Sequence, residues 1–287
     1  MKNNITIVSN DLEISKNIEK ILIDKFKSQG YDVSDSINED TLLVVSIGGD
    51  GSFLRAARNF DFPSIPFFCI NTGHLGFFAE ILPSEDEIDY FIQCCKNHEF
   101  SINELPLLEI EIDTEDGVVI DYAINEVVVR GNRSRTAHLQ LYVDKNYMET
   151  FSGDGLILST STGSTAYNYS AGGSIVDSSL NIIQITPISP ISTNAFRSFT
   201  SSIILPAFET KITIIPECKF DSTVLAVVDG EEFRYTGVKK IKVKGTDKKL
   251  NLLRLKDYEF WNRVYMKFLQ TYNYKENERR CNRDIIK

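Results

Sequence analysis

The stretch Thr41–Phe60, TLLVVSIGGDGSFLRAARNF, decides the fold of this chain. It begins with a short apolar run at residues 42–47 and continues with the glycine-rich segment Gly48–Gly51. An apolar run of this length that ends in glycines is typical of a β-strand buried on both faces. The apolar residues that follow recur at helical spacing. The stretch therefore predicts a strand, a turn that only glycines permit, and a helix.

Asp50 lies at the start of that predicted helix, where a negative charge is unexpected. The N-terminus of a helix attracts anions, because free N–H groups and the positive end of the helix dipole converge there. A carboxylate in this place suits a residue that holds a cation or accepts a proton, and it suits a phosphate ligand much less. Asp50 is therefore the first candidate for chemistry in the chain.

Length and composition exclude several classes of protein. At 287 residues the chain is long enough for two domains, and its hydrophobic fraction of 42% and charged fraction of 25% are those of a soluble globular protein. No apolar run approaches the ~20 residues that span a bilayer, and we see no signal peptide, so we expect no membrane association. The net charge of −9 argues against nucleic acid as a partner. Five scattered cysteines without a CxxC pair favour a cytoplasmic location.

The pattern of the chain changes near residue 98. Strands and helices alternate over residues 1–98, which predicts an α/β domain with a parallel sheet. Residues 99–256 contain short β-type runs, among them Val118–Val129, and predict a β-rich, mainly antiparallel second domain. Residues 257–287 begin with an amphipathic helix, which we expect to pack back on the first domain, and end in a charged tail from Lys275 onward.

A later stretch, Ser152–Gly173, combines clustered glycines with many hydroxyl and amide side chains. Glycines gathered in this way indicate tight turns or close approach of a ligand to the backbone. Hydroxyl and amide groups suit hydrogen bonds to a ribose or an amide, and the ring of Tyr167 suits stacking on a base. This stretch is the second candidate for a binding site.

Each short motif also has a plain structural interpretation when it is taken alone. Gly48–Gly51 is a strand–helix turn, Asn125 and Glu126 lie on the polar face of a strand, and Asp229–Gly230 is a hairpin turn. The Walker pattern and the GxGxxG fingerprint are both absent. The three histidines show no metal-ligand spacing, so the metal ligands stay unassigned.

Taken together, the motifs resemble those of the NAD kinase family, and the resemblance covers roughly residues 41–260. The first motif is shared with phosphofructokinases and diacylglycerol-type lipid kinases, whereas the block at residues 162–173 is far more specific. In chain order the motifs are Gly48–Gly51, Asn71–Phe77, Asn125–Glu126, Gly153–Thr160, Thr162–Gly173 and Asp229–Gly230.

The resemblance implies a fold, an activity and partners. The fold is a Rossmann-like α/β N-terminal domain followed by a β-rich second domain, with NAD bound between them, in a homodimer or homotetramer. The activity is phosphorylation of the adenosine ribose 2′-hydroxyl of NAD to give NADP. ATP or another phosphoryl donor, such as polyphosphate, supplies the phosphoryl group together with a divalent cation, of which Mg²⁺ is expected.

The resemblance also implies which residues form the site. Asp50 becomes the proton acceptor, and its action as a base or through Mg²⁺ stays open. The donor phosphates lie on Gly48, Gly49 and Gly51. The implied NAD contacts are Asp50, Gly51, Arg55, Asn125, Glu126, Asp154, Thr165, Ala166, Tyr167, Asn168 and Ser170.

Two alternative functions remain open at this point. One is a kinase with the same glycine loop that acts on another hydroxyl, of a sugar phosphate or a lipid, which leaves the block at residues 162–173 unexplained. The other is a dinucleotide sensor that binds NAD without catalysis.

Overall fold

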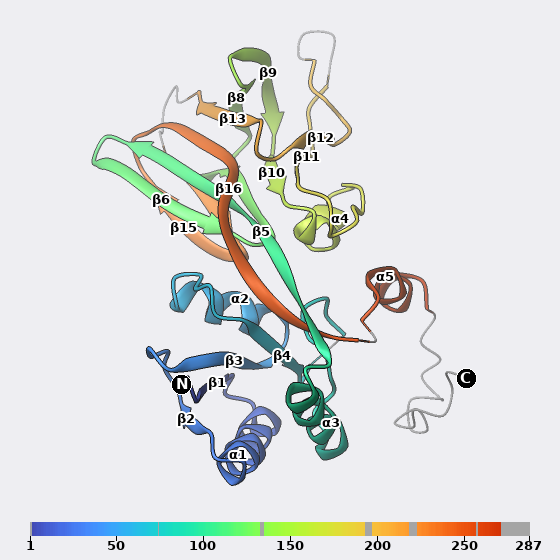
Figure 1. Ribbon diagram of the computed structural model, residues 1–287. Helices are drawn as coiled ribbons and strands as arrows, with labels where there is room; N and C mark the ends of the chain where they lie inside the picture. Colours follow the sequence, from blue (N-terminus) through green and yellow to red (C-terminus); the bar gives the residue numbers. More distant parts are fainter. Residues whose placement is uncertain are drawn as a thin grey trace.

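The computed structural model describes residues 2–73, 75–132, 135–192, 197–217, 223–256 and 258–270. Its N-terminal part is an α/β unit, and its β-rich part lies above that unit in Figure 1, connected to it by two long strands, β5 (Phe100–Thr114) and β16 (Val238–Leu255). The fold predicted from the sequence, an α/β unit followed by a β-rich unit and a helix, is confirmed. None of the described helices combines the length and hydrophobicity needed to cross a membrane.

The α/β unit is built on four parallel strands in the order β2-β1-β3-β4. Helices α1 and α3 pack against one face of this sheet and α2 packs against the other, because their apolar faces belong to separate clusters on its two sides. The stretch at residues 41–60 forms the predicted strand, turn and helix. The elements are β1 (Asn4–Ser9), α1 (Glu13–Ser28), β2 (Asp32–Ser34), β3 (Thr41–Gly48), α2 (Asp50–Asn59), β4 (Phe67–Asn71) and α3 (Glu85–Asn97).

The β-rich unit consists of two antiparallel layers with a core between them. In one layer β16 pairs with β5 and β13, β5 with β6, and β8 with β13 and β9. The other layer has the order β12-β11-β10-β7-β14-β15. The strands are β6 (Gly117–Ala123), β7 (Glu126–Gly131), β8 (Ala137–Val143), β9 (Asn146–Gly153), β10 (Gly155–Ser159), β11 (Ile182–Ile188), β12 (Ile203–Pro206), β13 (Lys211–Pro216), β14 (Val224–Val228) and β15 (Glu231–Tyr235).

The expected single run Val118–Val129 is two strands, β6 and β7, which end and begin on either side of residues 124–125. The chain leaves β6 in one layer and enters β7 in the other at this point. The reason is long-range: the backbone N–H groups of residues 124–126 are bound by a carboxylate from the turn at residues 229–230. No signal within the run itself marks this break.

The two units share one sheet, since Leu252 of β16 lies beside Phe67 of β4 in parallel pairing. Side chains from α2, β5 and β16 also form a common core cluster, in which Phe53 and Ile124 are both fully buried. This cluster fixes the start of α2 relative to the start of β7. Strand β16 runs through both units. The predicted domain boundaries at residues 98 and 256 stay predictions.

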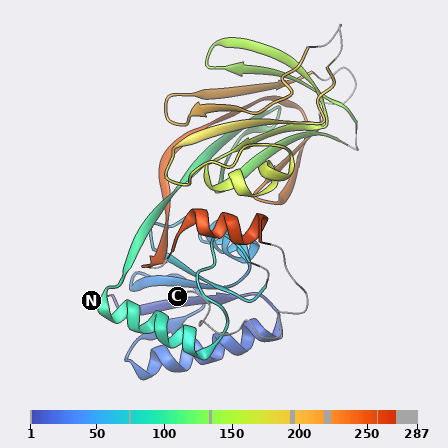
Figure 2. The same cartoon turned by 90° about the vertical axis from the view of Figure 1, so that its right-hand side faces the viewer.

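Three short helices lie where the units meet. They are η2 (Thr162–Thr165), α4 (Tyr167–Ser170) and α5 (Phe260–Phe268). Figure 2 shows α5 between the α/β unit and the β-rich unit. The ring of Phe268 contacts Phe77 of the first unit and Tyr169 of the second, with ring centroids 5.9 and 4.4 Å apart. Helix α5 therefore bridges both units. The charged tail from Lys275 lies outside the described residues.

Candidate active site

Asp50 is the first residue of α2, directly after the extended Gly49. Its carboxylate accepts hydrogen bonds from the backbone N–H groups of Phe77, at 2.8 Å, and Phe78, at 3.1 Å. A Cβ at Gly76 would lie 2.1 Å from Asp50 Oδ1, so only glycine fits at that position. The structure thus joins the first and second glycine motifs through one carboxylate. His74, which belongs to the second motif, lies outside the described residues.

The three glycines before α2 have different surroundings. A Cβ at Gly48 would lie 2.1 Å from Ser52 Oγ, and its φ of +157° is a conformation that favours glycine. At Gly49 and Gly51, by contrast, an added Cβ meets no heavy atom within 4 Å. Protein packing therefore requires glycine at residue 48, while the space beside residues 49 and 51 is open to a ligand.

Asn125 and Glu126 lie at the start of β7, and Asp229 holds the backbone there. The Asp229 carboxylate accepts hydrogen bonds from the backbone N–H groups of Ile124, Asn125 and Glu126, at 2.8, 2.7 and 3.2 Å. Asp229 and Gly230 also form the two-residue hairpin turn between β14 and β15, with φ values of +50° and +87°. The hairpin interpretation of Asp229–Gly230 is therefore correct, and the turn also organises the site.

Three buried polar atoms in this region have no hydrogen-bond partner among the described residues. They are Asn125 Oδ1, Glu126 Oε2 and Thr162 Oγ1. The segment that carries Thr162 lies directly on Asn125, because a Cβ at Gly163 would be 2.1 Å from the Asn125 carbonyl oxygen. A buried polar atom without a partner costs about 1–3 kcal/mol. A small group of such atoms is typical of a site whose ligand supplies the missing partners.

The two buried carboxyl groups here differ in their protonation state near neutral pH. Burial, together with the nearby charge of Asp229, raises the pKa of Glu126 to about 8. Burial also raises the pKa of Asp229, to about 6, although three N–H groups and Arg58 oppose this shift. At pH 7 Asp229 is therefore ionised and Glu126 is largely protonated, so Glu126 can donate a hydrogen bond as well as accept one.

The block at residues 162–173 folds into η2 and α4 beside the start of β7. Thr165 is buried, Ala166 is partly buried, and Tyr167 and Ser170 are exposed. The side chain of Asn168 is fully buried and accepts a hydrogen bond from Thr186 Oγ1 at 2.6 Å. Asn168 therefore links α4 to β11, whereas the exposed ring of Tyr167 is free to contact a ligand.

Asp154 is separated from the other predicted NAD contacts. It precedes β10, whose other end places Ser159 opposite Glu126 in the sheet. Five residues of strand span about 16 Å. The structure therefore gathers Asn125, Glu126 and residues 162–170, and it leaves the exposed Asp154 at the far end of β10.

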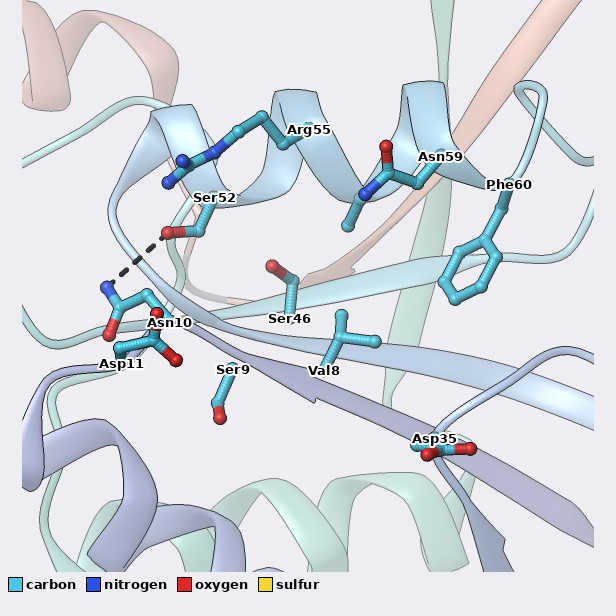
Figure 3. A pocket seen from close by; sticks show the side chains of 11 residues that line it. Val8, Ser9, Asn10, Asp11, Asp35, Ser46, Ser52, Arg55, Asn59 and Phe60 are labelled. Atoms are coloured by element: carbon cyan, nitrogen blue, oxygen red, sulfur yellow. Dashed lines mark hydrogen bonds between the residues drawn. The ribbon is translucent and has the colours of Figure 1, made fainter.

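Arg55 lines a cavity of about 480 Å³ on the α/β unit, shown in Figure 3. The cavity lies beside the ends of β1 and β3, where open α/β sheets bind ligands. Asn10 Nδ2 donates a hydrogen bond to Ser52 Oγ at 3.5 Å within it. The lining residues are Val8, Ser9, Asn10, Asp11, Asp35, Ser46, Ser52, Arg55, Ala56, Asn59 and Phe60.

The described residues contain no cluster of three or more His, Cys, Asp or Glu side chains that could enclose a metal ion. Mg²⁺ in phosphoryl-transfer sites is usually bound by one or two carboxylates, several waters and the substrate phosphates. A glycine turn with a single carboxylate fits an ion that arrives with its phosphate ligand. It does not fit a structural metal held by protein alone.

Arg58 is a site residue that the sequence did not identify. From α2 it donates to Asp121 Oδ1 at 2.6 Å and to the Tyr122 carbonyl at 3.0 Å. Its guanidinium also lies 4.0 Å from Asp229 and 3.6 Å from Glu231. The helix that begins with Asp50 is thereby bound to the turn that holds Asn125. A single sequence offers no signal for this pairing, since the partners lie far apart along the chain.

Comparison with known proteins assigns both units to one type of protein. The family model "ATP-NAD kinase N-terminal domain" matches residues 6–100, and "ATP-NAD kinase C-terminal domain" matches residues 124–255. The NAD kinase of Finegoldia magna is 37% identical over 276 residues, covering 94% of this chain and 100% of the relative. NAD kinase 2 of Halalkalibacterium halodurans is 33% identical over 243 residues, covering 84% and 89%.

Two solved structures share the fold. Yeast NADH kinase complexed with NADH superposes with a TM-score of 0.81 at 24% identity, covering 94% of this chain and 89% of the yeast chain. An NAD kinase from Archaeoglobus fulgidus in complex with ATP gives a TM-score of 0.70 at 22% identity, covering 92% and 97%.

Proposed function

The chain belongs to the NAD kinase family, which are phosphotransferases with an alcohol group as acceptor, and from this we propose that it phosphorylates the adenosine ribose 2′-hydroxyl of NAD to give NADP. The family resemblance inferred from the sequence is confirmed. Nothing in the comparisons favours a sugar-phosphate or lipid kinase, or a non-catalytic sensor.

One observation in the structure carries the proposal. The unpartnered atoms of Asn125, Glu126 and Thr162 lie together where the β-rich unit meets the helix that starts at Asp50. A dinucleotide supplies ribose hydroxyls and amide groups, which are partners of the chemical kind that these buried atoms lack. The exposed ring of Tyr167 offers a stacking surface for a base beside them.

The chemistry assigns a proton transfer to Asp50. A ribose hydroxyl is a poor nucleophile at neutral pH, and a carboxylate that orients it and takes its proton is typically worth about 10²–10⁴-fold in rate. As the 2′-oxygen forms its bond to the γ-phosphorus, the bond from that phosphorus to the bridging oxygen breaks and ADP leaves. The N–H groups of Phe77 and Phe78 hold the carboxylate in one orientation for this step.

We place the donor on the α/β unit. ATP suits the cavity that Ser52 of α2 lines, because the N-terminus of this helix has no side-chain cap among the described residues and a helix N-terminus can bind phosphate oxygens. A Mg²⁺ ion bound to the donor phosphates, with Asp50 as the neighbouring carboxylate, would neutralise charge on the group being transferred. The residues present fit this arrangement, as described above.

We further propose a cytoplasmic homodimer or homotetramer. Support for subunit pairing comes from β6, which pairs only with β5 among the described strands. Its residues Val118, Val119 and Ile120 are 58, 39 and 58% exposed. An exposed apolar edge strand of this kind is a common pairing surface. Asp154 and the remaining predicted contacts stay predictions until a complex with NAD is solved.

The deciding experiment mixes purified protein with NAD, Mg²⁺ and either ATP or polyphosphate, and detects NADP with an NADP-specific dehydrogenase. We expect NADP with at least one donor. A panel of sugar phosphates and lipid alcohols serves as the control for the acceptor. Absence of NADP with both donors, together with a shift of the melting temperature by NAD, would instead establish a dinucleotide sensor.

A further inference from the structure

Two arginines near the end of the described chain bind the loop that holds Asp50. Arg254, the penultimate residue of β16, donates from Nη2 to the Phe77 carbonyl at 2.8 Å and from Nη1 to the Phe78 carbonyl at 3.1 Å. Arg263 in α5 donates from Nη1 to the carbonyls of Gly76 and Ala79, at 3.3 and 2.8 Å. Four successive carbonyls therefore accept from the two side chains.

The same peptide groups donate to Asp50 on their other side. The peptide between Gly76 and Phe77 accepts from Arg263 through its oxygen and donates to Asp50 through its N–H. The peptide between Phe77 and Phe78 is placed in the same way between Arg254 and Asp50. Hydrogen bonds in a chain polarise one another, and a cation on the oxygen side makes the N–H a stronger donor.

Both guanidinium groups are themselves held in place. Glu80 Oε2 lies 3.0 Å from Arg254 and 3.7 Å from Arg263, and the ring of Tyr258 lies 3.6 Å from Arg254. Arg254 is only 5% exposed. A buried ion pair adds little net stability compared with apolar side chains of similar size. Stability alone is therefore a weak reason for two arginines at this place.

We propose that Arg254 and Arg263 are positioning residues for Asp50, acting through the peptide groups of residues 76–78. They fix the orientation of two N–H groups, which in turn fix the carboxylate that faces the acceptor hydroxyl. The inference rests on the proposed function, because the benefit is to proton transfer. It also explains why α5 bridges the two units next to the site.

The test compares Arg263→Gln with Arg234→Gln, whose arginine is an exposed surface residue on β15. We expect Arg263→Gln to lower kcat about 10- to 100-fold with the KM for NAD nearly unchanged, because misplacing a catalytic group affects the transition state more than binding. Arg234→Gln is expected to behave as wild type. Arg263→Lys, which keeps the charge, is expected to recover part of the loss.

Two readouts do not depend on turnover. Trp261 in α5 is the only tryptophan in the chain, so its fluorescence reports whether α5 stays docked. Amide hydrogen exchange at Phe77 and Phe78 reports whether their N–H groups still bind Asp50. We expect unchanged Trp261 emission and faster exchange at these two amides in Arg263→Gln.

Several outcomes would overturn the inference. They are an unchanged kcat with unchanged exchange, a rise in KM alone, or a change in Trp261 emission that accounts for the loss by undocking of α5. If Arg263→Gln does not fold, Arg254→Gln replaces it, since Glu80 then keeps Arg263 as its ion-pair partner. A wild type that makes no NADP would refute the proposed function, and the exchange comparison would still decide the positioning role.

Discussion

Asp229 binds the backbone of Asn125 across 104 residues of sequence: its Oδ1 accepts the Asn125 N–H at 2.7 Å. The neighbouring N–H groups of Ile124 and Glu126 donate to the same carboxylate. A hairpin turn from a distant part of the chain thus positions the start of β7. The same turn positions the side chains of Asn125 and Glu126, each of which has a buried oxygen without a partner in the described part of the chain. Changing that turn is expected to change the site.

Asp229→Asn tests this relationship. The amide offers one acceptor oxygen and an NH₂ group that cannot accept, so at least one backbone N–H loses its partner. We expect the free energy of unfolding to fall by about 1–3 kcal/mol, measured by urea denaturation, and the affinity for NAD to fall with it. Asp116→Asn, in the exposed turn after β5, is the control and should change neither. Equal stability of both variants would show that the Asp229 carboxylate is dispensable.

Stability should fall as pH rises through the range in which Glu126 titrates. The pKa of Glu126 is raised from 4.5 to about 8, so the folded chain keeps a proton that the unfolded chain has lost. The free energy of unfolding therefore decreases from about pH 4.5 to about pH 8. Asp229, raised from 3.8 to about 6, contributes in the same direction only at lower pH.

Urea titrations of the ligand-free protein between pH 6.5 and 8.5 isolate the contribution of Glu126. Glu126→Gln cannot lose the proton, so we expect its stability to be flatter over this interval and higher than wild type at the alkaline end. The same slope in both proteins would mean that Glu126 is ionised throughout, contrary to its burial.

Local signals in the sequence were sufficient for the first half of the site. The apolar run, the glycines and the helical spacing at residues 41–60 act over short distances, so the strand, the turn and Asp50 at the start of α2 followed from the pattern alone. The change to antiparallel strands after residue 98 was visible for the same reason, since alternating burial is a local property of each strand.

The remainder depends on pairings between distant segments. Val118–Val129 looked like one strand because its composition gives no sign of the carboxylate that binds residues 124–126. Arg58, Arg254 and Arg263 could not be selected among the other basic residues, because their partners come from elsewhere in the chain. The resemblance supplied Asn125 and Glu126, and only the structure shows why their side chains lack partners.

Gly76→Ala is expected to displace Asp50. The new Cβ would lie 2.1 Å from Asp50 Oδ1, so the carboxylate must leave the Phe77 and Phe78 amides. We expect kcat to fall by about 100-fold, the scale associated with misplacing a reacting group by 1 Å. Gly73→Ala, on the same loop, is the control, because its Cβ would meet only Asn71 Oδ1 at 4.0 Å. Similar turnover in both variants would argue against a fixed Asp50.

Asp50→Asn separates binding from catalysis. Asparagine keeps the size of the side chain and cannot accept the hydroxyl proton, so we expect nearly all turnover to be lost while NAD still binds, as judged by calorimetric titration. Turnover within about tenfold of wild type would mean that Asp50 is not the base, since general-base help is typically worth about 10²–10⁴-fold.

Arg58 is the last group to test, because it couples the two units at the end of α2 away from Asp50. Its ion pair with Asp121 is largely shielded from water, with side chains 16 and 17% exposed. Removing one member of a buried pair costs about 3–5 kcal/mol, and we expect Arg58→Met to approach that loss in urea denaturation. Arg234→Met, at a surface pair with Glu232, should change the free energy of unfolding by no more than about 0.5 kcal/mol.

Arg58 also lowers the pKa of Asp229, so its removal is expected to raise that pKa further. The fall in the free energy of unfolding that Asp229 causes between about pH 3.8 and 6 should then extend to higher pH. Arg58→Lys keeps the charge without the planar fork that reaches both Asp121 and the Tyr122 carbonyl, and should recover only part of the loss. If Arg58→Met is as stable as Arg234→Met and its pH profile is unchanged, then apolar packing of Phe53 and Ile124 alone sets the position of α2 against β7.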